Sequence, residues 1–335
     1  MISEALDTAL DATALSGSFV RRRRNEIGDE DILVKEDDSP VTIVDIAAQV
    51  LMRLHIEEDV RVPALPMCGE ESPETLLASD ADRFRSRVLE LVQSEKPSIG
   101  EAEMIALLER GSHRPEPGSG PTCWICDPID GTRRYLSGHR YSSCLGLLLD
   151  GELTCGAIAC PDLGHDPSDP VTEPSDTGSL YCASLGGGAH VIVGLDEGSA
   201  GRRTRLTLPE RREGDQVIRV ARSVGASGLR PSHVWEGLEA NGGILEIVHI
   251  DNQCKYVALA TNRVDCIYQH AGAPDAEPSC IWDFAPGVLL ASEAGAEVLD
   301  RDGRSFDFNQ GATLLSNRGL AANGPGIRGF FSTVG

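Results

Sequence analysis

The run Asp127-Pro128-Ile129-Asp130-Gly131-Thr132 directly follows an apolar stretch, Cys123 to Cys126, that is typical of a short buried strand. Pro128 restricts the backbone between the two aspartates, and Gly131 permits a tight turn after them. The pattern predicts a loop that holds two carboxylates close together. Such a pair is unfavourable unless cations neutralise it, and hard oxygen ligands suit Mg²⁺, which keeps waters and a phosphate in its coordination shell.

The same run has a structural alternative, an aspartate-rich turn that caps a helix. Two more carboxylate-bearing segments weigh against that alternative, although each by itself is compatible with an ordinary helix cap. Glu70 lies in Gly69-Glu70-Glu71-Ser72, and Asp283 lies just before a predicted helix. The backbone amides of Gly131 and Thr132 add candidate donors for an anion such as phosphate.

Composition limits the possible partners of the chain. Its 335 residues, of which 41% are apolar, predict a soluble globular protein with one large domain or two subdomains. The formal net charge of -22 argues against binding to polymeric DNA or RNA, which requires clustered lysines and arginines. No stretch approaches the ~18 uninterrupted apolar residues of a membrane span, so no membrane association is expected.

The chain has ten cysteines with neither a signal peptide nor regular spacing, which predicts reduced thiols and a cytoplasmic location. Cys123 and Cys126 have the spacing of a redox or zinc motif. No second pair accompanies them, and the segment alternates as a strand does, so we interpret both as structural.

Periodicity predicts a layered α/β architecture, because helix and strand signals alternate along the chain. The interval from residue 141 to residue 160 has the pattern of a β-hairpin with its turn at Asp150-Gly151. Candidate subdomains are residues 1–195 and 196–335, the first carrying most of the acidic motifs. The other predicted elements are helices over residues 2–20 and 42–54 and strands over residues 178–183 and 189–193.

Six separate segments resemble motifs of the lithium-sensitive inositol monophosphatase and bisphosphate phosphatase superfamily, and most closely those of its 3'(2'),5'-bisphosphate nucleotidases. The resemblance extends from about residue 35 to residue 325. The segments are Asp38-Ser39-Pro40-Val41-Thr42 with Asp45, GEES from Gly69, DPIDGT from Asp127, GAIACPDL from Gly156, DNQCKY from Asp251 and IWDFAPGVLLASEAGA from Ile281.

The resemblance implies a five-layer αβαβα sandwich and a phosphatase that uses two or three Mg²⁺ ions and is inhibited by lithium. One ion is expected on Glu70, Asp127 and the carbonyl of Ile129, a second on Asp127, Asp130 and Asp283, and a third near Asp45. By the same resemblance, Asp45 and Thr132 orient the attacking water, and two cations on either side of a phosphate favour in-line hydrolysis.

The segments that recognise the substrate depart from the nucleotidase pattern. Gly225 and Gly228, which flank Ser227, stand where the nucleotidases have Glu and a His that contacts substrate. Gln269 stands where they have an Arg that pairs with the distal phosphate. A lost charge-assisted bond costs roughly 1.5 to 3 kcal/mol, and the neighbouring His270 would restore only part of it.

Lys255 is retained within DNQCKY, whereas Asn252 replaces a Ser. We therefore expect Ser227, Asn252, Lys255 and Gln269 to contact the substrate, and we expect that substrate to be a small phosphorylated nucleoside or sugar other than adenosine 3',5'-bisphosphate. Two alternatives stay open: an inositol or sugar phosphate phosphatase of the same superfamily, and a non-catalytic regulator that binds nucleotides or metals. The oligomeric state is not predicted.

Overall fold

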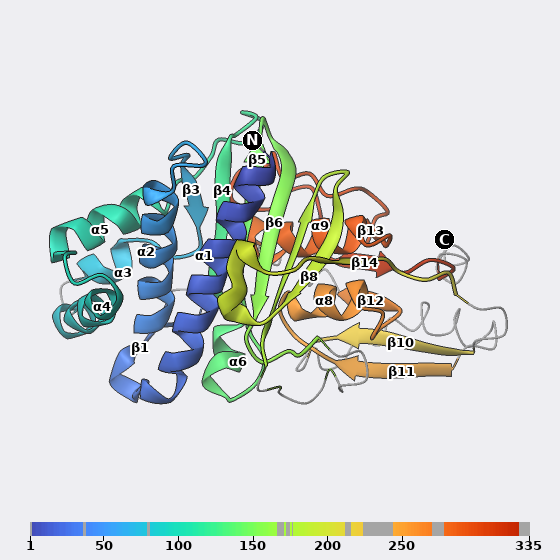
Figure 1. Ribbon diagram of the computed structural model, residues 1–335, viewed down its shortest axis with the longest axis horizontal. Helices are drawn as coiled ribbons and strands as arrows, with labels where there is room; N and C mark the ends of the chain where they lie inside the picture. Colours follow the sequence, from blue (N-terminus) through green and yellow to red (C-terminus); the bar gives the residue numbers. More distant parts are fainter. Residues whose placement is uncertain are drawn as a thin grey trace.

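The computed structural model describes residues 2–35, 38–78, 81–165, 171, 175, 177–211, 216–223, 244–269 and 278–327. Within them, two β-sheets enclose a pair of helices, and further helices cover the outer face of the larger sheet (Figure 1). The α/β layering predicted from the sequence is confirmed. Among the described residues we identify four layers of the expected five.

The larger sheet has seven strands in the order β3-β4-β5-β6-β7-β8-β9. Only β3 and β4 pair in parallel, and every other neighbouring pair in this sheet is antiparallel. The strands are β3 (Met67–Gly69), β4 (Cys123–Asp130), β5 (Ser142–Leu149), β6 (Glu152–Cys160), β7 (Ser179–Ser184), β8 (Gly188–Val193) and β9 (Thr204–Leu206).

Strand β4 is buried on both faces because its side chains alternate between two hydrophobic cores. Trp124 and Cys126 pack with α1 (Ile2–Arg23), whereas Cys123 and Ile125 pack with the helices on the opposite face. This alternation explains the Cys-x-x-Cys spacing. All ten cysteines are free thiols, so the prediction that this pair is structural agrees with the fold.

Helices α1 and α2 (Ile43–Glu58) cover the outer face of the larger sheet, and the outer helices lie beyond α2 (Figure 1). Helix α2 begins at a capping box, because Thr42 accepts the amide of Asp45 and the Asp45 carboxylate accepts the amide of Thr42. The outer and connecting elements are α3 (Glu74–Leu77), α4 (Asp82–Glu95), α5 (Glu101–Arg110), η1 (Arg24–Glu26), η2 (Asp29–Asp31) and the small pair β1 (Ile32–Val34) and β2 (Pro40–Thr42).

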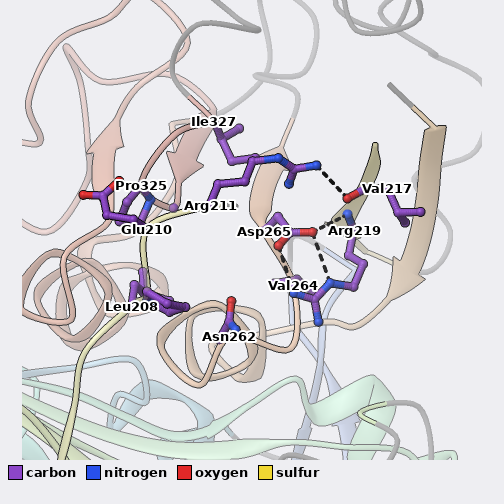
Figure 2. Close-up of a pocket in the computed structure, with 12 residues that line it drawn as sticks. Leu208, Glu210, Arg211, Val217, Arg219, Asn262, Val264, Asp265, Pro325 and Ile327 are labelled. Carbon is purple, nitrogen blue, oxygen red and sulfur yellow. Dashed lines mark hydrogen bonds and ion pairs between the residues drawn. The ribbon is translucent and has the colours of Figure 1, made fainter. Parts of the chain in front are cut away.

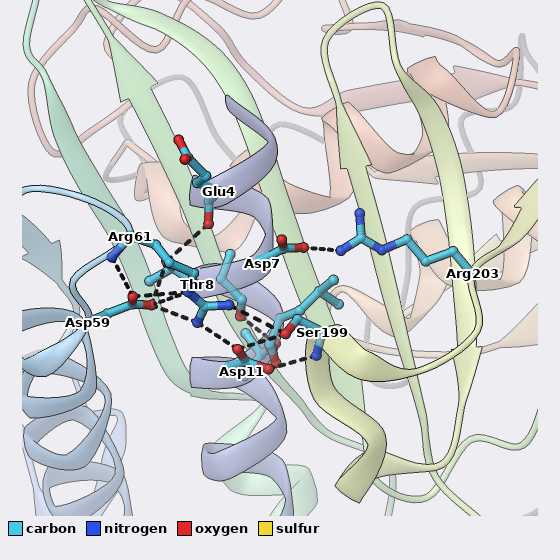
Figure 3. A network of polar contacts seen from close by, with 11 residues as sticks. Glu4, Asp7, Thr8, Asp11, Asp59, Arg61, Ser199 and Arg203 are labelled. Atoms are coloured by element: carbon cyan, nitrogen blue, oxygen red, sulfur yellow. Dashed lines mark hydrogen bonds and ion pairs between the residues drawn. The ribbon is translucent and has the colours of Figure 1, made fainter. Parts of the chain in front are cut away.

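A network of hydrogen bonds and ion pairs links α1 to its neighbours (Figure 3). Arg61 donates to Asp11 at 2.6 Å and to Asp59 at 2.7 Å. Asp11 also accepts the amide of Ser199, at 2.6 Å, in η3 (Leu195–Ala200). These bonds join the end of α2, the middle of α1 and the segment that leads to β9.

The smaller sheet has the strand order β11-β10-β12-β14-β13, with β10 parallel to both of its neighbours. Helices α8 (Cys254–Ala260) and α9 (Ala285–Glu293) lie between the two sheets. The strands are β10 (Val217–Arg222), β11 (Ile244–His249), β12 (Cys266–Gln269), β13 (Glu297–Leu299) and β14 (Leu320–Asn323).

The helices predicted at residues 2–20 and 42–54 are present as α1 and α2, and the predicted hairpin is β5–β6. The DPIDGT run differs from the prediction in one respect: Asp127 to Asp130 continue β4 instead of forming a loop after it. The proposed division at residue 195 stays a prediction, and β9 still belongs to the larger sheet. No described helix is long and apolar enough to cross a membrane.

Candidate metal centre

Three carboxylates from two distant segments meet at the end of β4. One oxygen each of Asp127, Asp130 and Asp283 lies within 4.8 Å of the others, and Asp283 ends the short helix η4 (Ile281–Asp283). In a regular strand, residues three apart point to opposite faces. Here the pairing of β4 with β5 shifts register between Asp127 and Asp130, and such a bulge re-aims side chains, which explains how both aspartates reach one site.

Asp127 and Asp130 are buried and Asp283 is half-buried, and the like charges of the three carboxylates repel one another. Burial, followed by the charges of Glu70 and Asp130, raises the pKa of Asp127 well above its ordinary value. Burial, followed by the charges of Asp130 and Glu70, also raises the pKa of Asp283. Oδ1 of Asp127 accepts no hydrogen bond from any residue that the structure describes. An unpartnered buried carboxylate oxygen among other carboxylates fits a cation, and an all-oxygen donor set can bind a hard metal ion.

Glu70 is placed beside Asp127 by the parallel pairing of β3 with β4, because its amide donates to the Cys126 carbonyl at 3.0 Å. Its carboxylate is not part of the three-residue cluster. Instead, Lys35 Nζ lies 2.9 Å from Glu70 Oε1 and 2.8 Å from Glu71 Oε1. Burial lowers the pKa of Lys35, but the charges of Glu70 and Glu71 outweigh that effect and raise it. The ammonium thus neutralises part of the acidic site.

Asp45 and Thr132 form a second, adjoining unit. Thr132 Oγ1 donates to Asp45 Oδ1 at 2.8 Å and lies 3.1 Å from the carbonyl oxygen of Ile129. The other oxygen of Asp45 accepts from the amide and the hydroxyl of Thr42. Burial and the charge of Glu70 raise the pKa of Asp45 to about 6, against the hydrogen bonds from Thr42.

Gly131 connects β4 to the short helix α6 (Thr132–Leu136) with a φ of 95°, a left-handed conformation that favours glycine. A Cβ here would also lie 2.8 Å from Asn252 Nδ2. Both constraints require glycine at the point where the aspartate-bearing strand turns. The predicted role of the Gly131 and Thr132 amides in phosphate binding stays a prediction.

The predicted substrate residues lie in different surroundings. Asn252 donates to the Arg140 carbonyl at 2.8 Å and accepts the amide of Cys254 at 2.9 Å, so its side chain holds the backbone locally. Lys255 Nζ lies 2.7 Å from Gln269 Oε1. Burial lowers the pKa of Lys255, and the charge of Asp130 opposes that shift. Ser227, Gly225, Gly228 and His270 lie outside the described residues.

A cavity of about 400 Å³ lies elsewhere, beside β10, the end of α8 and the end of β14 (Figure 2). It contains none of the carboxylates predicted to bind metal. Its two arginines are engaged: Arg219 bonds Asp265 at 2.8 Å, and Arg211 donates to the Val217 carbonyl at 2.9 Å. The predicted metal ligands therefore lie together in the acidic cluster and not in this cavity.

Among the residues that contact the acidic site, Lys35 and Gln253 were not predicted from the sequence. Lys35 belongs to a segment otherwise rich in acidic residues, and a lone lysine before Asp38-Ser39-Pro40 was the available signal. The backbone N–H of Gln253 donates a hydrogen bond to Asp130 Oδ2. Gln253 lies between Asn252 and Lys255, the two residues of this segment that were predicted to contact the substrate. A polar residue at the start of a helix gives no further signal by itself.

The pKa values predict how the metal-free protein responds to pH. Burial raises the pKa of Asp130 to about 7, with the Lys255 charge opposing the shift. Between about pH 4 and pH 7 the folded state therefore binds more protons than the unfolded chain. Its unfolding free energy is fully present at the acidic end of this window and falls as the pH rises through the folded pKa values.

Thermal unfolding in EDTA is expected to give a melting temperature that decreases from pH 5 to pH 8. Saturating divalent cation should reduce that decrease, because the ion replaces the protons as the neutralising charge. Asp130→Asn should also reduce it, which separates the site from the general repulsion of an acidic protein. A metal-free melting temperature that increases across this range would contradict the assignment.

The fold and the site together define a layered α/β protein with a largely buried carboxylate cluster that can bind a metal ion. The chain belongs to the inositol monophosphatase family, whose model matches residues 1–328. It is 32% identical to a 3'(2'),5'-bisphosphate nucleotidase of Emericella nidulans, over 86% of this chain and 85% of that protein. It is 31% identical to the Schizosaccharomyces pombe protein of the same name, over 88% and 83%. The resemblance noted in the sequence is confirmed.

Solved structures support the fold. CysQ from Bacteroides thetaiotaomicron, a bacterial member of the family, has a TM-score of 0.60 at 18% identity, covering 95% of this chain and 96% of that one. Thermotoga maritima IMPase has a TM-score of 0.59 at 16% identity, covering 99% of both chains. At these identities the likeness concerns the architecture alone.

Proposed function

We propose that this protein is a Mg²⁺-dependent phosphomonoesterase that removes a 3'(2')-type phosphate from a small phosphorylated nucleoside. The observation that carries the proposal is the cluster of Asp127, Asp130 and Asp283 with an unpartnered buried oxygen on Asp127, next to the Thr132–Asp45 pair. The names of the relatives support the nucleotidase assignment.

Asp127 would be shared between two ions, the first held also by Glu70 and the Ile129 carbonyl, and the second by Asp130 and Asp283. A third ion would lie near Asp45. When bound, Mg²⁺ supplies positive charge that lowers the pKa of an attacking water and stabilises the leaving oxygen. The Ile129 carbonyl oxygen lies 3.1 Å from the Thr132 hydroxyl oxygen, whose hydrogen goes to Asp45, so the carbonyl lone pairs would be available to a cation.

The chain's own residues would position and deprotonate the water. Thr132 donates its hydroxyl hydrogen to Asp45, so its oxygen lone pairs are available to accept a hydrogen bond from a water. Asp45 is then the proton acceptor, through Thr132 or directly. Burial raises the pKa of Asp45 to about 6, which suits a base that works near neutral pH. The amides of Gly131 and Thr132 would bind the phosphate.

Lys255 and Gln269 would contact the distal part of the substrate, together with Ser227 and Asn252. Lys255 donates a hydrogen bond to Gln269, which is neutral. An arginine at position 269 would add a second positive charge. Without it, binding of a second phosphate is expected to be weaker, which supports a substrate other than adenosine 3',5'-bisphosphate. The free thiols support a reducing compartment, and we propose a cytoplasmic location.

Phosphate release from a panel of nucleoside bisphosphates, inositol phosphates and fructose bisphosphate, with Mg²⁺ and with EDTA, tests the proposal. We expect Mg²⁺-dependent release that is fastest from a nucleotide other than adenosine 3',5'-bisphosphate. If the adenosine bisphosphate reacts at least as fast as every other compound, the substrate shift is wrong. Fastest release from an inositol or sugar phosphate would favour the first alternative, and no release from any compound would favour a non-catalytic binding protein.

A further inference from the structure

Gln253 forms hydrogen bonds at two of the three clustered aspartates: to Asp130 itself and to the residue that precedes Asp283. It is completely buried, with a relative exposure of 0%. Its backbone amide donates to Oδ2 of Asp130. Its side-chain Nε2 donates to the carbonyl of Trp282, the residue before Asp283, at 2.8 Å, and its Oε1 accepts the amide of Gly287 at 2.7 Å.

These bonds join segments that lie far apart in the sequence and that also pack against each other in the core between the sheets. Asp130 ends β4 of the larger sheet, whereas Asp283 ends η4 and precedes α9. The first amides of a helix have no intrahelical acceptor. Gln253 Oε1 satisfies the amide of Gly287 in the first turn of α9, while Nε2 holds the carbonyl just before Asp283. A primary amide is suited to this position because it provides a donor and an acceptor on one side chain.

The packing around Gly287 supports the same function. A Cβ at Gly287 would lie 2.2 Å from Cδ2 of Tyr256, so α8 and α9 approach each other closely at this point. The close approach brings the Gly287 amide within reach of Gln253. The close packing of α8 against α9 therefore fixes the first turns of both helices. Asp283 lies directly before α9, next to this contact.

The bonds to Asp130 also decide how its carboxylate is oriented. Oδ2 accepts from Gln253 and lies 3.3 Å from the Ser142 hydroxyl. With Oδ2 held in this way, Oδ1 is the oxygen that remains available to a cation. Outer residues of this kind typically change metal affinity by about 10- to 100-fold when they are removed.

We propose that Gln253 is a positioning residue that holds Asp130 and Asp283 at the spacing required by a divalent cation. The inference rests on the proposed function, because it assumes that these carboxylates bind Mg²⁺. Gln253 is not itself a proposed metal ligand, and it acts through the carboxylates that it positions. Its removal would widen the site without removing a ligand.

Calorimetric titration of the full-length metal-free protein with Mg²⁺, without substrate, tests the proposal. Gln253→Met keeps an unbranched chain of similar length and removes both side-chain hydrogen bonds. It is expected to raise the Mg²⁺ dissociation constant at least about 10-fold. Gln253→Asn keeps the amide but shortens its reach, and it should raise the constant at least about threefold; it decides the matter if the Met variant does not fold.

Arg61→Met is the control for a general loss of stability. Arg61 pairs with Asp11 and Asp59 (Figure 3), and Asp59 caps the end of α2 opposite to Asp45. Helix α2 has 16 residues, so its two ends lie about 24 Å apart. This variant should lower the melting temperature while its Mg²⁺ dissociation constant stays within about twofold of the wild-type value.

Mg²⁺ affinity within twofold of wild type in the folded Gln253 variants would overturn the role of Gln253. Equal weakening in Arg61→Met would also overturn it, because the effect would then reflect stability alone, and so would a failure of both Gln253 variants to fold when Arg61→Met folds. A wild-type protein that binds no Mg²⁺ would instead contradict the proposed function, on which the inference depends.

Discussion

Asp127→Asn is expected to lower Mg²⁺-dependent phosphate release by more than about 100-fold. Loss of a residue that only supports a metal ligand typically costs up to about 100-fold, and loss of the ligand itself should cost more. Asp127 is the carboxylate proposed to contact both ions, and an amide carries no charge to share between them. The same substitution should keep or raise the melting temperature in EDTA at pH 8. Asp127 is a buried acid whose Oδ1 has no described partner, so its ionised form destabilises the metal-free fold.

Asp265→Asn is a suitable comparison for this variant. Asp265 accepts from Arg219 at 2.8 Å beside the separate cavity (Figure 2), and its substitution should lower the melting temperature and leave phosphate release intact. The two aspartates are thus expected to show opposite effects on stability and activity. Phosphate release within tenfold of wild type in Asp127→Asn would exclude Asp127 as a shared ligand.

Thr132→Val is expected to lower kcat by about 10²- to 10⁴-fold, the range associated with loss of general acid–base catalysis. Valine has nearly the same shape as threonine but has no hydroxyl. It therefore cannot donate the hydrogen bond that Thr132 donates to Asp45 at 2.8 Å. The half-saturating Mg²⁺ concentration should change little, because Thr132 is not a proposed ligand. Steady-state kinetics at several Mg²⁺ concentrations separate the two quantities.

Thr132→Ser is the matched control, since it keeps the hydroxyl and should retain most of the activity. Asp45→Asn combined with Thr132→Val should cost little more than either single change if the two residues act as one unit. Additive losses, or a Thr132→Val variant that differs from wild type only in its Mg²⁺ requirement, would show that the hydroxyl does not act on the water.

The sequence predicted most of the local structure around the site, because helices, strands and turns depend on short-range patterns. Apolar spacing identified α1 and α2, and Asp150-Gly151 identified the β5–β6 turn. The extension of β4 through Asp130 was missed. Pro normally interrupts a strand, but a register shift of β4 against β5 accommodates Pro128 within the sheet.

The candidate ligands were predicted through motif resemblance, whereas their surroundings were not. Lys35 contacts Glu70 and Glu71 only because the β1–β2 segment folds back toward the end of β3. Gln253 reaches Trp282 and Gly287 only because α8 and α9 pack together. Neither contact has a sequence period or a fixed spacing that a pattern could detect.

The sequence by itself determined the chemical groups available to this protein: the carboxylates of DPIDGT, the separate Glu70 and Asp283, and the Asp45–Thr132 pair. It also determined the local elements that carry them, since backbone preferences act over a few residues. Only the tertiary structure decided that Asp127, Asp130 and Asp283 converge within 4.8 Å. That convergence depends on the bulge in β4 and on packing between the sheets, which join segments far apart in the chain.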